Sequence, residues 1–258
     1  MESGRFSAIA HGELAILNPI GSASLDRMLD LLGLRQGDTV IDFGCGKAEM
    51  LLRLIERSNV RAVGVDLNPR FIAAAREAAA RRAPGAALTL VEGDATQYAE
   101  ARGAFDAALA VGATHVFGGL GASLAALGAW VRRGGRILVG EGYWKREPHP
   151  DYLAVLGATP DELTDHAGNV AAGTAAGLEL LTAVETALDD WDRYEDTYAA
   201  NVEIFAAENP DDPDRDAMLK RIRRWRDGYL QWGRDTLGFA LYLFRKPSAP
   251  WAVRSRPT

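Results

Sequence analysis

The segment that most constrains the fold is residues 40–50, VIDFGCGKAEM, in which an apolar strand leads through a glycine turn into a helix. A second apolar strand, residues 62–65, ends on Asp66, which lies 20 residues after Gly46. Glycines in such a turn let the backbone approach a ligand, and an acid at the tip of the neighbouring strand accepts hydrogen bonds from ribose hydroxyls. The pattern therefore predicts an α/β fold that binds a nucleoside-bearing cofactor.

Two further predicted strands bring side chains to the same edge of the sheet. Residues 88–92 are followed by Asp94, which suits an exocyclic amine of adenine, and by Ala95, which leaves room for the ring. Residues 105–111 form the next strand, which runs into Gly112. A glycine turn alone has a purely steric explanation in any parallel sheet. The cofactor prediction therefore depends on three successive strand ends taken together.

As a set, these motifs resemble the class I S-adenosylmethionine (SAM)-dependent methyltransferases over roughly residues 25–142, with a last strand near residues 239–244. The resemblance implies SAM as cofactor, and it implies cofactor contacts from Asp42, Gly44, Cys45, Gly46, Asp66, Leu67, Asp94, Ala95 and Val111. One departure is Ala48, which stands where the family usually has a third glycine. Because alanine tolerates positive φ poorly, we expect either a less strained turn or a slightly displaced loop.

A dinucleotide cofactor is the main alternative, and Glu49 argues against it. A pyrophosphate is bound by G-x-G-x-x-G, but here Glu49 occupies the position three residues after Gly46 and would bring a carboxylate near the phosphates. SAM carries no phosphate, and its ammonium can donate to backbone carbonyls of the loop. The sequence therefore favours SAM over NAD.

The length, charge and composition of the chain exclude some classes of partner and indicate a cellular compartment. The chain has 258 residues and a net charge of −6, which suits one α/β domain over residues 1–258 and argues against a nucleic-acid partner. With Cys45 as the only cysteine and four scattered histidines, neither a disulfide nor a metal site is expected. The absence of a signal pattern and of a long apolar run predicts a cytoplasmic protein with no membrane partner. The oligomeric state is left open.

Helical patterns alternate with the strands and predict a doubly wound sheet. Helices are expected over residues 22–32, 48–57, 69–82 and 121–131, and the last three strands over residues 136–140, 178–186 and 238–244. We therefore predict a seven-stranded, mostly parallel sheet with helices on both faces.

The connection between the sixth and seventh strands, residues 188–237, is too long to lack structure of its own. Aromatic residues recur in it at three- and four-residue steps, which predicts two helices separated near residues 209–213. These aromatics are either the core stripe of a helical hairpin or part of a lid over the substrate. Residues 1–21 are a second segment that we expect to cover the site.

Three segments are expected beyond the carboxyl ends of the strands, where ligands bind in open α/β sheets. After the fourth strand comes His115, our first candidate for a catalytic base or a substrate-orienting group, because imidazole titrates near neutral pH. Candidate substrate-binding residues are His11, Glu141, Tyr143 and Trp144. Glu141 can equally fix its own loop, and the two aromatic residues can equally be packing residues.

The acceptor is predicted mainly by exclusion. The end of the fourth strand lacks the Asp/Asn-Pro-Pro-Tyr/Phe pattern by which related enzymes hold a nucleobase amine, so a small-molecule acceptor is favoured over DNA. The accepting atom, O, N, C or S, stays open. Two other functions are considered: a SAM-using enzyme of another outcome, such as cyclisation of the cofactor, and a non-catalytic SAM-binding protein.

Overall fold

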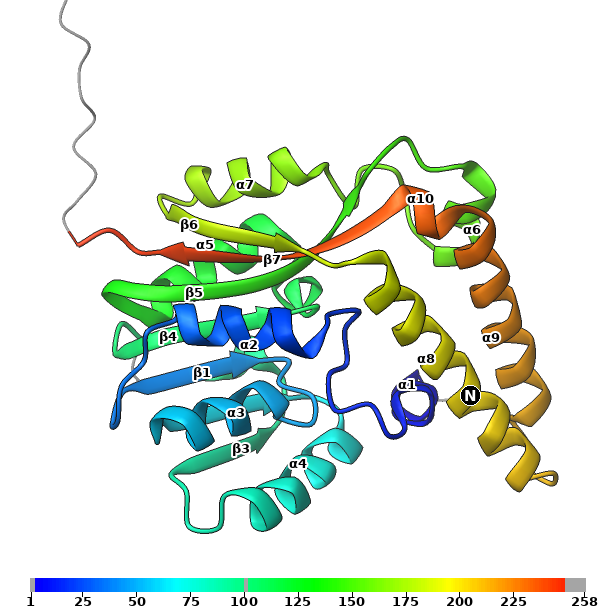
Figure 1. Ribbon diagram of the computed structural model, residues 1–258, viewed down its shortest axis with the longest axis horizontal. Helices are drawn as coiled ribbons and strands as arrows, with labels where there is room; N and C mark the ends of the chain where they lie inside the picture. The colour runs from blue at the N-terminus through cyan, green and yellow to red at the C-terminus, as the bar shows by residue number, and fades with distance from the viewer. Residues whose placement is uncertain (1–2, 100–101, 249–258) are drawn as a thin grey trace, which may run out of the picture.

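The computed structural model describes residues 3–99 and 102–248; residues 1–2 of the predicted N-terminal cover and residues 249–258 of the predicted domain lie outside this range. Seven strands form one sheet in the order β3-β2-β1-β4-β5-β7-β6 (Figure 1). They are β1 (Thr39–Phe43), β2 (Arg61–Asp66), β3 (Leu88–Glu92), β4 (Phe105–Val111), β5 (Val131–Trp144), β6 (Glu179–Glu185) and β7 (Leu237–Arg245). Strand β7 pairs antiparallel with β5 and β6, and the other pairs of neighbouring strands are parallel. The prediction of a seven-stranded, mostly parallel sheet is confirmed.

Both faces of the sheet are buried, which explains why its central strands are apolar throughout. Successive residues point to opposite faces, so Val40 and Leu138 join one apolar cluster while Ile41 and Val139 join the other. The first face is covered by α2 (Ser22–Leu31), α3 (Glu49–Ser58) and α4 (Pro69–Arg82). The second is covered by α5 (Leu120–Trp130) and α7 (His166–Ala175). The sheet is therefore doubly wound.

Capping residues and prolines in the sequence determine where most of the helices begin and end. Helix α4 has the predicted bounds, with Pro69 in its first turn and the Asn68 side chain accepting a hydrogen bond from the Arg70 backbone N–H. The remaining short elements are η1 (Ala95–Gln97), η2 (Thr114–Phe117) and α6 (Pro150–Leu156). No helix within residues 3–99 and 102–248 is long and apolar enough to cross a bilayer.

Strand β5 is longer than predicted. It pairs with β4 as far as Gly140 and continues to Trp144, because β7 pairs with it along the whole of this extension. Glu141, Tyr143 and Trp144 therefore lie within a strand, and the prediction that they follow its end is wrong. A single sequence does not show which strand supplies the backbone partners for such an extension.

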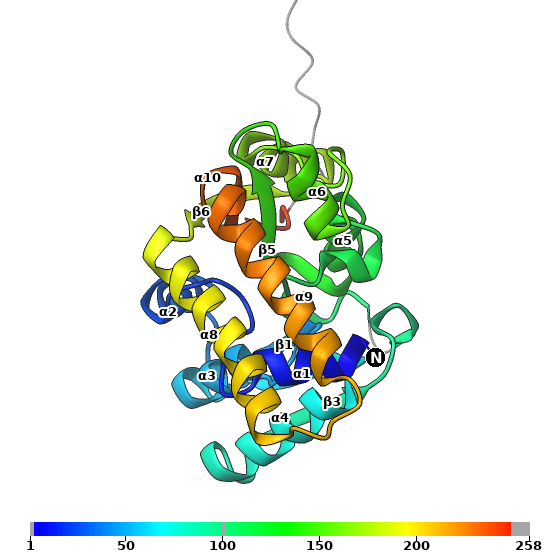
Figure 2. The same ribbon diagram turned by 90° about the vertical axis from the view of Figure 1, so that its right-hand side faces the viewer.

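Helices between β6 and β7 gather beyond the carboxyl ends of the parallel strands (Figures 1 and 2). They are α8 (Leu188–Glu208), α9 (Arg215–Gly228), the π-helical turn η3 (Tyr229–Gly233) and α10 (Arg234–Thr236). Helix α1 (Ser3–His11) packs against α8, and a third apolar cluster joins it to α8 and α9 through Phe6, Ala10, Ala199, Val202, Met218 and Ile222. We call α1, α8 and α9 the cover.

The aromatic stripe of α8 divides between two environments. Trp191 stacks on Tyr229, with ring centroids 6.4 Å apart, and belongs to the same cluster as Phe239 of the sheet. One and two turns further on, Tyr194 and Tyr198 face His11 of α1. The first part of the stripe is thus core, and the second part contacts α1.

Candidate cofactor and acceptor site

A cavity of about 730 Å³ lies beyond the carboxyl ends of β1, β2, β3 and β4. The structure brings together in its wall ten of the residues predicted for the site: Gly44, Cys45, Gly46, Asp66, Leu67, Asp94, Ala95, Val111, His115 and His11. This volume is typical of a pocket for a cofactor or a drug-sized molecule. Asp42, Glu141, Tyr143 and Trp144 do not line it.

The glycine turn after β1 runs through left-handed backbone. Gly44 and Gly46 have φ of +73° and +54°, and a Cβ on Gly44 would overlap the Cβ of Ala113. Ala48 also adopts this conformation, with φ 60° and ψ 24°, so the expectation of a less strained turn is wrong. The strain is offset by packing, because Ala48 is fully buried among the residues of the first cluster.

Asp66 connects the end of β2 to the glycine turn. Its Oδ2 accepts the backbone N–H of Gly46 at 2.8 Å, and its Oδ1 accepts the N–H of Asn68 at 2.8 Å. A carboxylate has about four acceptor positions, so both oxygens keep capacity for further donors. Asp66 can therefore hold the turn and still accept hydrogen bonds from a ribose.

Asp42 lies fully buried behind the cavity wall. Within the described part of the chain, neither of its carboxyl oxygens has a hydrogen-bond partner. Burial, with the negative charge of Asp66 as a smaller cause, raises the pKa of Asp42 to about 8. A buried carboxyl without a partner is costly, and a cation held at the turn would relieve that cost. The ammonium of SAM is a group of this kind, so the turn fits the predicted cofactor.

Asp94 and Cys45 occupy opposite environments in the wall. Asp94 is exposed and its Oδ1 accepts hydrogen bonds from the Thr96 hydroxyl and N–H at 2.7 and 2.8 Å, which lower its pKa. Both of these hydrogen bonds use Oδ1, and neither uses the Oδ2 atom of Asp94.

Cys45 is buried, and a Cβ on Gly64 would lie 2.8 Å from its Sγ. It acts as a small filler between β1 and β2.

His115 is exposed on η2 and lines the cavity just after Ala113. The loop that carries it is anchored from behind: Thr114 donates its hydroxyl to Glu141, and Ser123 donates to the Thr114 carbonyl at 2.8 Å. Glu141 also accepts the Gly142 N–H at 3.0 Å, and burial raises its pKa. Of the two roles considered for Glu141, the structure shows the one in which it fixes the loop.

Tyr143 and Trp144 are packing residues. Both are buried; Tyr143 donates to Glu185, and the Trp144 Nε1 donates to the carbonyl of Pro160 at 2.9 Å. Because they lie inside β5 with their polar atoms satisfied, they form no wall of the cavity. Their assignment to a substrate-binding wall is corrected accordingly.

His11 ends α1 and belongs to an aromatic group with Phe71, Tyr194 and Tyr198. Its Nδ1 lies 2.8 Å from the Ser7 carbonyl, and its Nε2 lies 3.1 Å from the Tyr194 hydroxyl. Burial is the main reason that the pKa of His11 is lowered. His11 was a candidate substrate-binding residue; the structure places it at the end of a helix, in the cavity wall.

Residues 12–21, which link α1 to α2, cross the cavity, and we call them the strap. Ala15, Ile16, Leu17, Asn18 and Ile20 of the strap line the cavity, and none of them was predicted as a site residue. We expected residues 1–21 to cover the site, but the sequence does not show which residues of this segment line the cavity.

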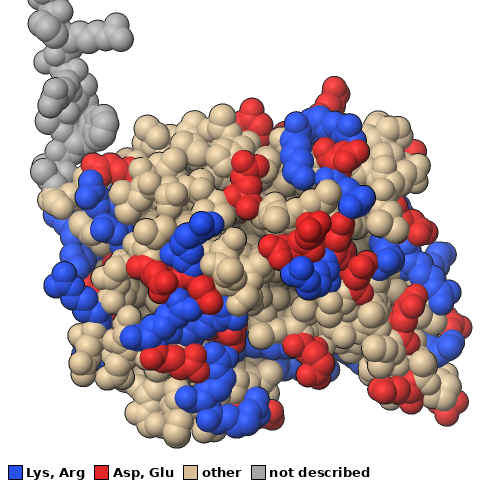
Figure 3. All heavy atoms as spheres, in the orientation of Figure 1, with Lys and Arg blue, Asp and Glu red and all other residues tan. Residues whose placement is uncertain are grey.

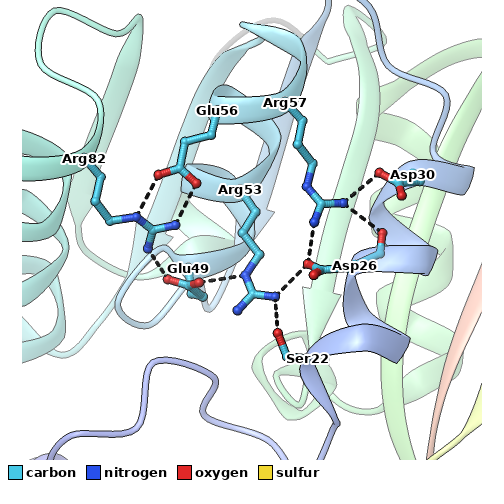
Figure 4. A network of polar contacts seen from close by, with 8 residues as sticks. All are labelled: Ser22, Asp26, Asp30, Glu49, Arg53, Glu56, Arg57 and Arg82. Atoms are coloured by element: carbon cyan, nitrogen blue, oxygen red, sulfur yellow. Dashed lines mark hydrogen bonds and ion pairs between the residues drawn. The ribbon is translucent and has the colours of Figure 1, made fainter.

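Glu49, at the start of α3, also lines the cavity, but its charge is matched. Its carboxylate binds Arg53 at 2.7 Å and also Arg82, which binds Glu56 as well (Figure 4). Charges of both signs alternate over α2, α3 and α4 on this face (Figure 3). The expected repulsion between Glu49 and a pyrophosphate is therefore weakened by its two arginine partners.

The charges of all the residues that line the cavity argue against a dinucleotide more strongly than Glu49 alone does. Among the described residues that line the cavity there is no Lys or Arg, and its acids are Glu49, Asp66 and Asp94. A pyrophosphate would find no cationic side chain there, whereas a sulfonium and an ammonium meet a negative environment. No group of three or more metal-ligating side chains occurs in the described residues either.

Comparison with known proteins agrees with this geometry. The family profile described as "Methyltransferase domain" matches residues 40–135. The uncharacterized protein YjhP of Escherichia coli (strain K12) is 26% identical over 94% of this chain and 98% of its own length. A SAM-dependent methyltransferase from Geobacter sulfurreducens in complex with S-adenosylhomocysteine (SAH) superposes with a TM-score of 0.87 at 27% identity, covering 93% of this chain and 97% of that one.

A second such enzyme, from Thiobacillus denitrificans and also in complex with SAH, gives a TM-score of 0.87 at 25% identity over 95% of this chain and 99% of its own. Residues 40–135 thus form a methyltransferase domain, and the chain has the fold of the class I SAM-dependent methyltransferases. Its cofactor is SAM, as the motifs at the strand ends predicted.

Proposed function

We propose that this methyltransferase acts on a small-molecule acceptor that enters the cavity beside His115. The observation that carries the proposal is the make-up of the cavity wall, which combines the loops after β1, β2, β3 and β4 with residues of the strap and of α1. His11 and His115 both line this cavity. A cavity of about 730 Å³ that receives SAM leaves room for a small acceptor.

The cofactor side of the cavity is assigned residue by residue. Gly44 and Gly46 would receive the amino-acid end of SAM, Asp66 with Leu67 the ribose, and Asp94 with Ala95 the adenine. Asp42 contributes from behind the turn, where an ammonium held nearby would favour the ionised form of its unpartnered carboxyl. Bound SAM supplies an electrophilic methyl group on a sulfonium.

The cavity wall as a whole offers apolar surface and no positive charge to an acceptor. Ile16, Leu17, Met50 and Val116 contribute aliphatic surface, and no Lys or Arg lines the described wall. A carboxylate or phosphate on the acceptor would lose its hydration there without gaining a cationic partner. We therefore assign an acceptor that is uncharged or cationic and has an apolar body.

His115 would orient the acceptor and receive its proton. Its ring is exposed to the cavity, while Glu141 and Ser123 fix the loop on which it sits. The protein otherwise contributes by alignment and by the exclusion of water, which are the main requirements of an in-line displacement.

The test is incubation with methyl-labelled SAM and a fractionated metabolite extract, followed by mass spectrometry. We expect a small molecule that gains one labelled methyl group, in an amount that depends on the wild-type enzyme and falls with His115→Ala. A reaction with SAM alone serves as control and detects cyclisation or cleavage of the cofactor. Label found only in macromolecules, or a new product from SAM alone, would contradict the proposal.

A further inference from the structure

Lys47 follows Gly46 in the glycine turn, yet its side chain leaves the turn and crosses to the strap. Its Nζ donates to the backbone carbonyls of His11 at 3.3 Å, of Gly12, and of Leu14 at 2.9 Å. An ammonium has three N–H donors, so these three carbonyls use all of them. Burial lowers the pKa of Lys47, and the Glu13 carboxylate opposes that shift. The turn and the strap are thus connected by one half-buried charge.

Two residues of the strap rest on glycines of the loops that meet at the cavity. A Cβ on Gly46 would lie 2.5 Å from Cδ1 of Leu17, and a Cβ on Gly112 would overlap Oδ1 of Asn18. The Asn18 Nδ2 also donates to the carbonyl of Val111 at 3.3 Å. Such close approach requires residues without Cβ. The strap is therefore docked directly on the loops that follow β1 and β4.

The other side of the strap is attached to the cover. The Tyr194 hydroxyl donates to the carbonyl of Leu17 at 3.3 Å. Within the cover, Asn201 of α8 donates to the carbonyl of Ala10, near the end of α1 that leads into the strap, at 3.0 Å. Lys47 is the charged link that ties it to the cofactor loop instead.

We propose that Lys47 is a positioning residue that holds the strap closed over bound cofactor, so that opening of the strap limits cofactor release. This inference rests on the proposed placement of SAM in the cavity. Lys47 touches no reacting atom and acts through Leu17 and Asn18, which it presses onto Gly46 and Gly112. Without its ammonium, three carbonyls lose a charge-assisted donor, and the strap opens more often.

The experiment measures the rates of SAH association and dissociation by stopped flow, together with hydrogen exchange of the strap amides. The variants are Lys47→Met, which keeps the length but removes the donors, Lys47→Arg, which keeps the charge, and Lys220→Met. Lys220 is exposed on α9 and controls for the loss of one positive charge. Thermal unfolding of each variant shows that it is folded.

We expect Lys47→Met to release SAH at least about tenfold faster, with faster strap exchange and an association rate that is not reduced. Lys47→Arg should fall between this variant and the wild type, and Lys220→Met should match the wild type. Gly112→Ala, which displaces Asn18 without touching Lys47, should also accelerate SAH release. This variant tests the strap as the barrier to release even if Lys47→Met does not fold.

Unchanged release and unchanged strap exchange in folded Lys47→Met would overturn the role of Lys47. Unchanged release in Gly112→Ala would overturn the role of the strap as the barrier to release, and with it the proposal. A wild-type protein whose SAH protects the strap but not the loops after β1, β2 and β3 would instead overturn the placement of the cofactor. The two failures are therefore distinguishable.

Discussion

The carboxylate of Asp66 accepts the backbone N–H of Gly46 at 2.8 Å, across the gap between β2 and the turn after β1. The acid that is proposed to bind the ribose therefore also shapes the turn that is proposed to bind the other end of SAM. Preorganisation of this kind lowers the conformational cost of binding, because the turn need not be ordered by the ligand. It also means that one substitution affects two parts of the cofactor site.

Replacement of Asp66 by Ala should weaken SAM and SAH binding by roughly ten- to a hundredfold, since charge-assisted hydrogen bonds contribute about 1.5 to 3 kcal/mol. Isothermal calorimetry measures the loss directly. Glu77→Ala, which removes an exposed carboxylate from α4, is the matched control and should bind as the wild type does. Unchanged affinity in Asp66→Ala would remove this residue from the cofactor site.

Replacement of Asp42 by Asn should stabilise the cofactor-free protein at pH 8 and weaken its binding of SAM. The folded-state pKa of about 8 lies above the ordinary value of 3.8, so the folded state binds more protons than the unfolded state between these values. The free energy of unfolding of the wild type thus falls as pH rises through this window. The amide that replaces the carboxyl in Asp42→Asn does not titrate, so the free energy of unfolding of the variant does not fall with pH for this reason.

Calorimetric Tm values of wild type and Asp42→Asn, measured without ligand, should therefore differ most at pH 8 and least near pH 4. His11, whose pKa is lowered from its ordinary value of 6.5, makes stability rise with pH below that value, which is the opposite trend. Because His11 is present in both proteins, its contribution cancels when their Tm values are subtracted. Parallel curves across this range would show that Asp42 is ionised in the fold.

Replacement of His115 by Ala should lower kcat for the acceptor by about a hundredfold or more and leave SAM affinity nearly unchanged, because general bases typically contribute 10² to 10⁴. Steady-state kinetics with the acceptor found by methyl labelling measures this, and calorimetry checks the cofactor. His149→Ala, at an exposed position on the surface, controls for the loss of an imidazole. Full kcat in His115→Ala would leave the loop with a structural role alone.

Hydrogen exchange should divide α8 into two parts. Near Trp191, which packs in the cluster shared with the sheet, exchange should be as slow as in β1. From Ala199 onward, where α8 contacts α1 and α9 in a separate cluster, exchange should be faster and should slow at least about tenfold when SAH is added. Uniformly slow exchange that ignores the ligand would show that the cover is a fixed part of the core.

The sequence predicted the sheet and the cofactor side of the site because both depend on local patterns. A turn that needs positive φ requires glycine at positions 44 and 46, and a parallel strand buried on both faces is apolar throughout. The extension of β5 was missed because it depends on pairing with β7, a strand far along the chain from it. Residues 1–21 were expected to cover the site, but the individual strap residues that line the cavity were missed for a similar reason: the contact between Asn18 and Val111 joins residues 93 positions apart.

The separate apolar cluster of the cover has a consequence for synthesis. It joins Phe6 and Ala10 to Met218 and Ile222, so the ribosome must make most of the chain before the cluster can form. The pairing of β1, β2, β3 and β4, by contrast, is complete once Val111 has emerged. Non-local contacts form late because closing long loops costs entropy before any contact is gained. During translation, the apolar residues of α1 therefore cannot be buried in this cluster until α8 and α9 have been made, and until then they are open to non-native contacts.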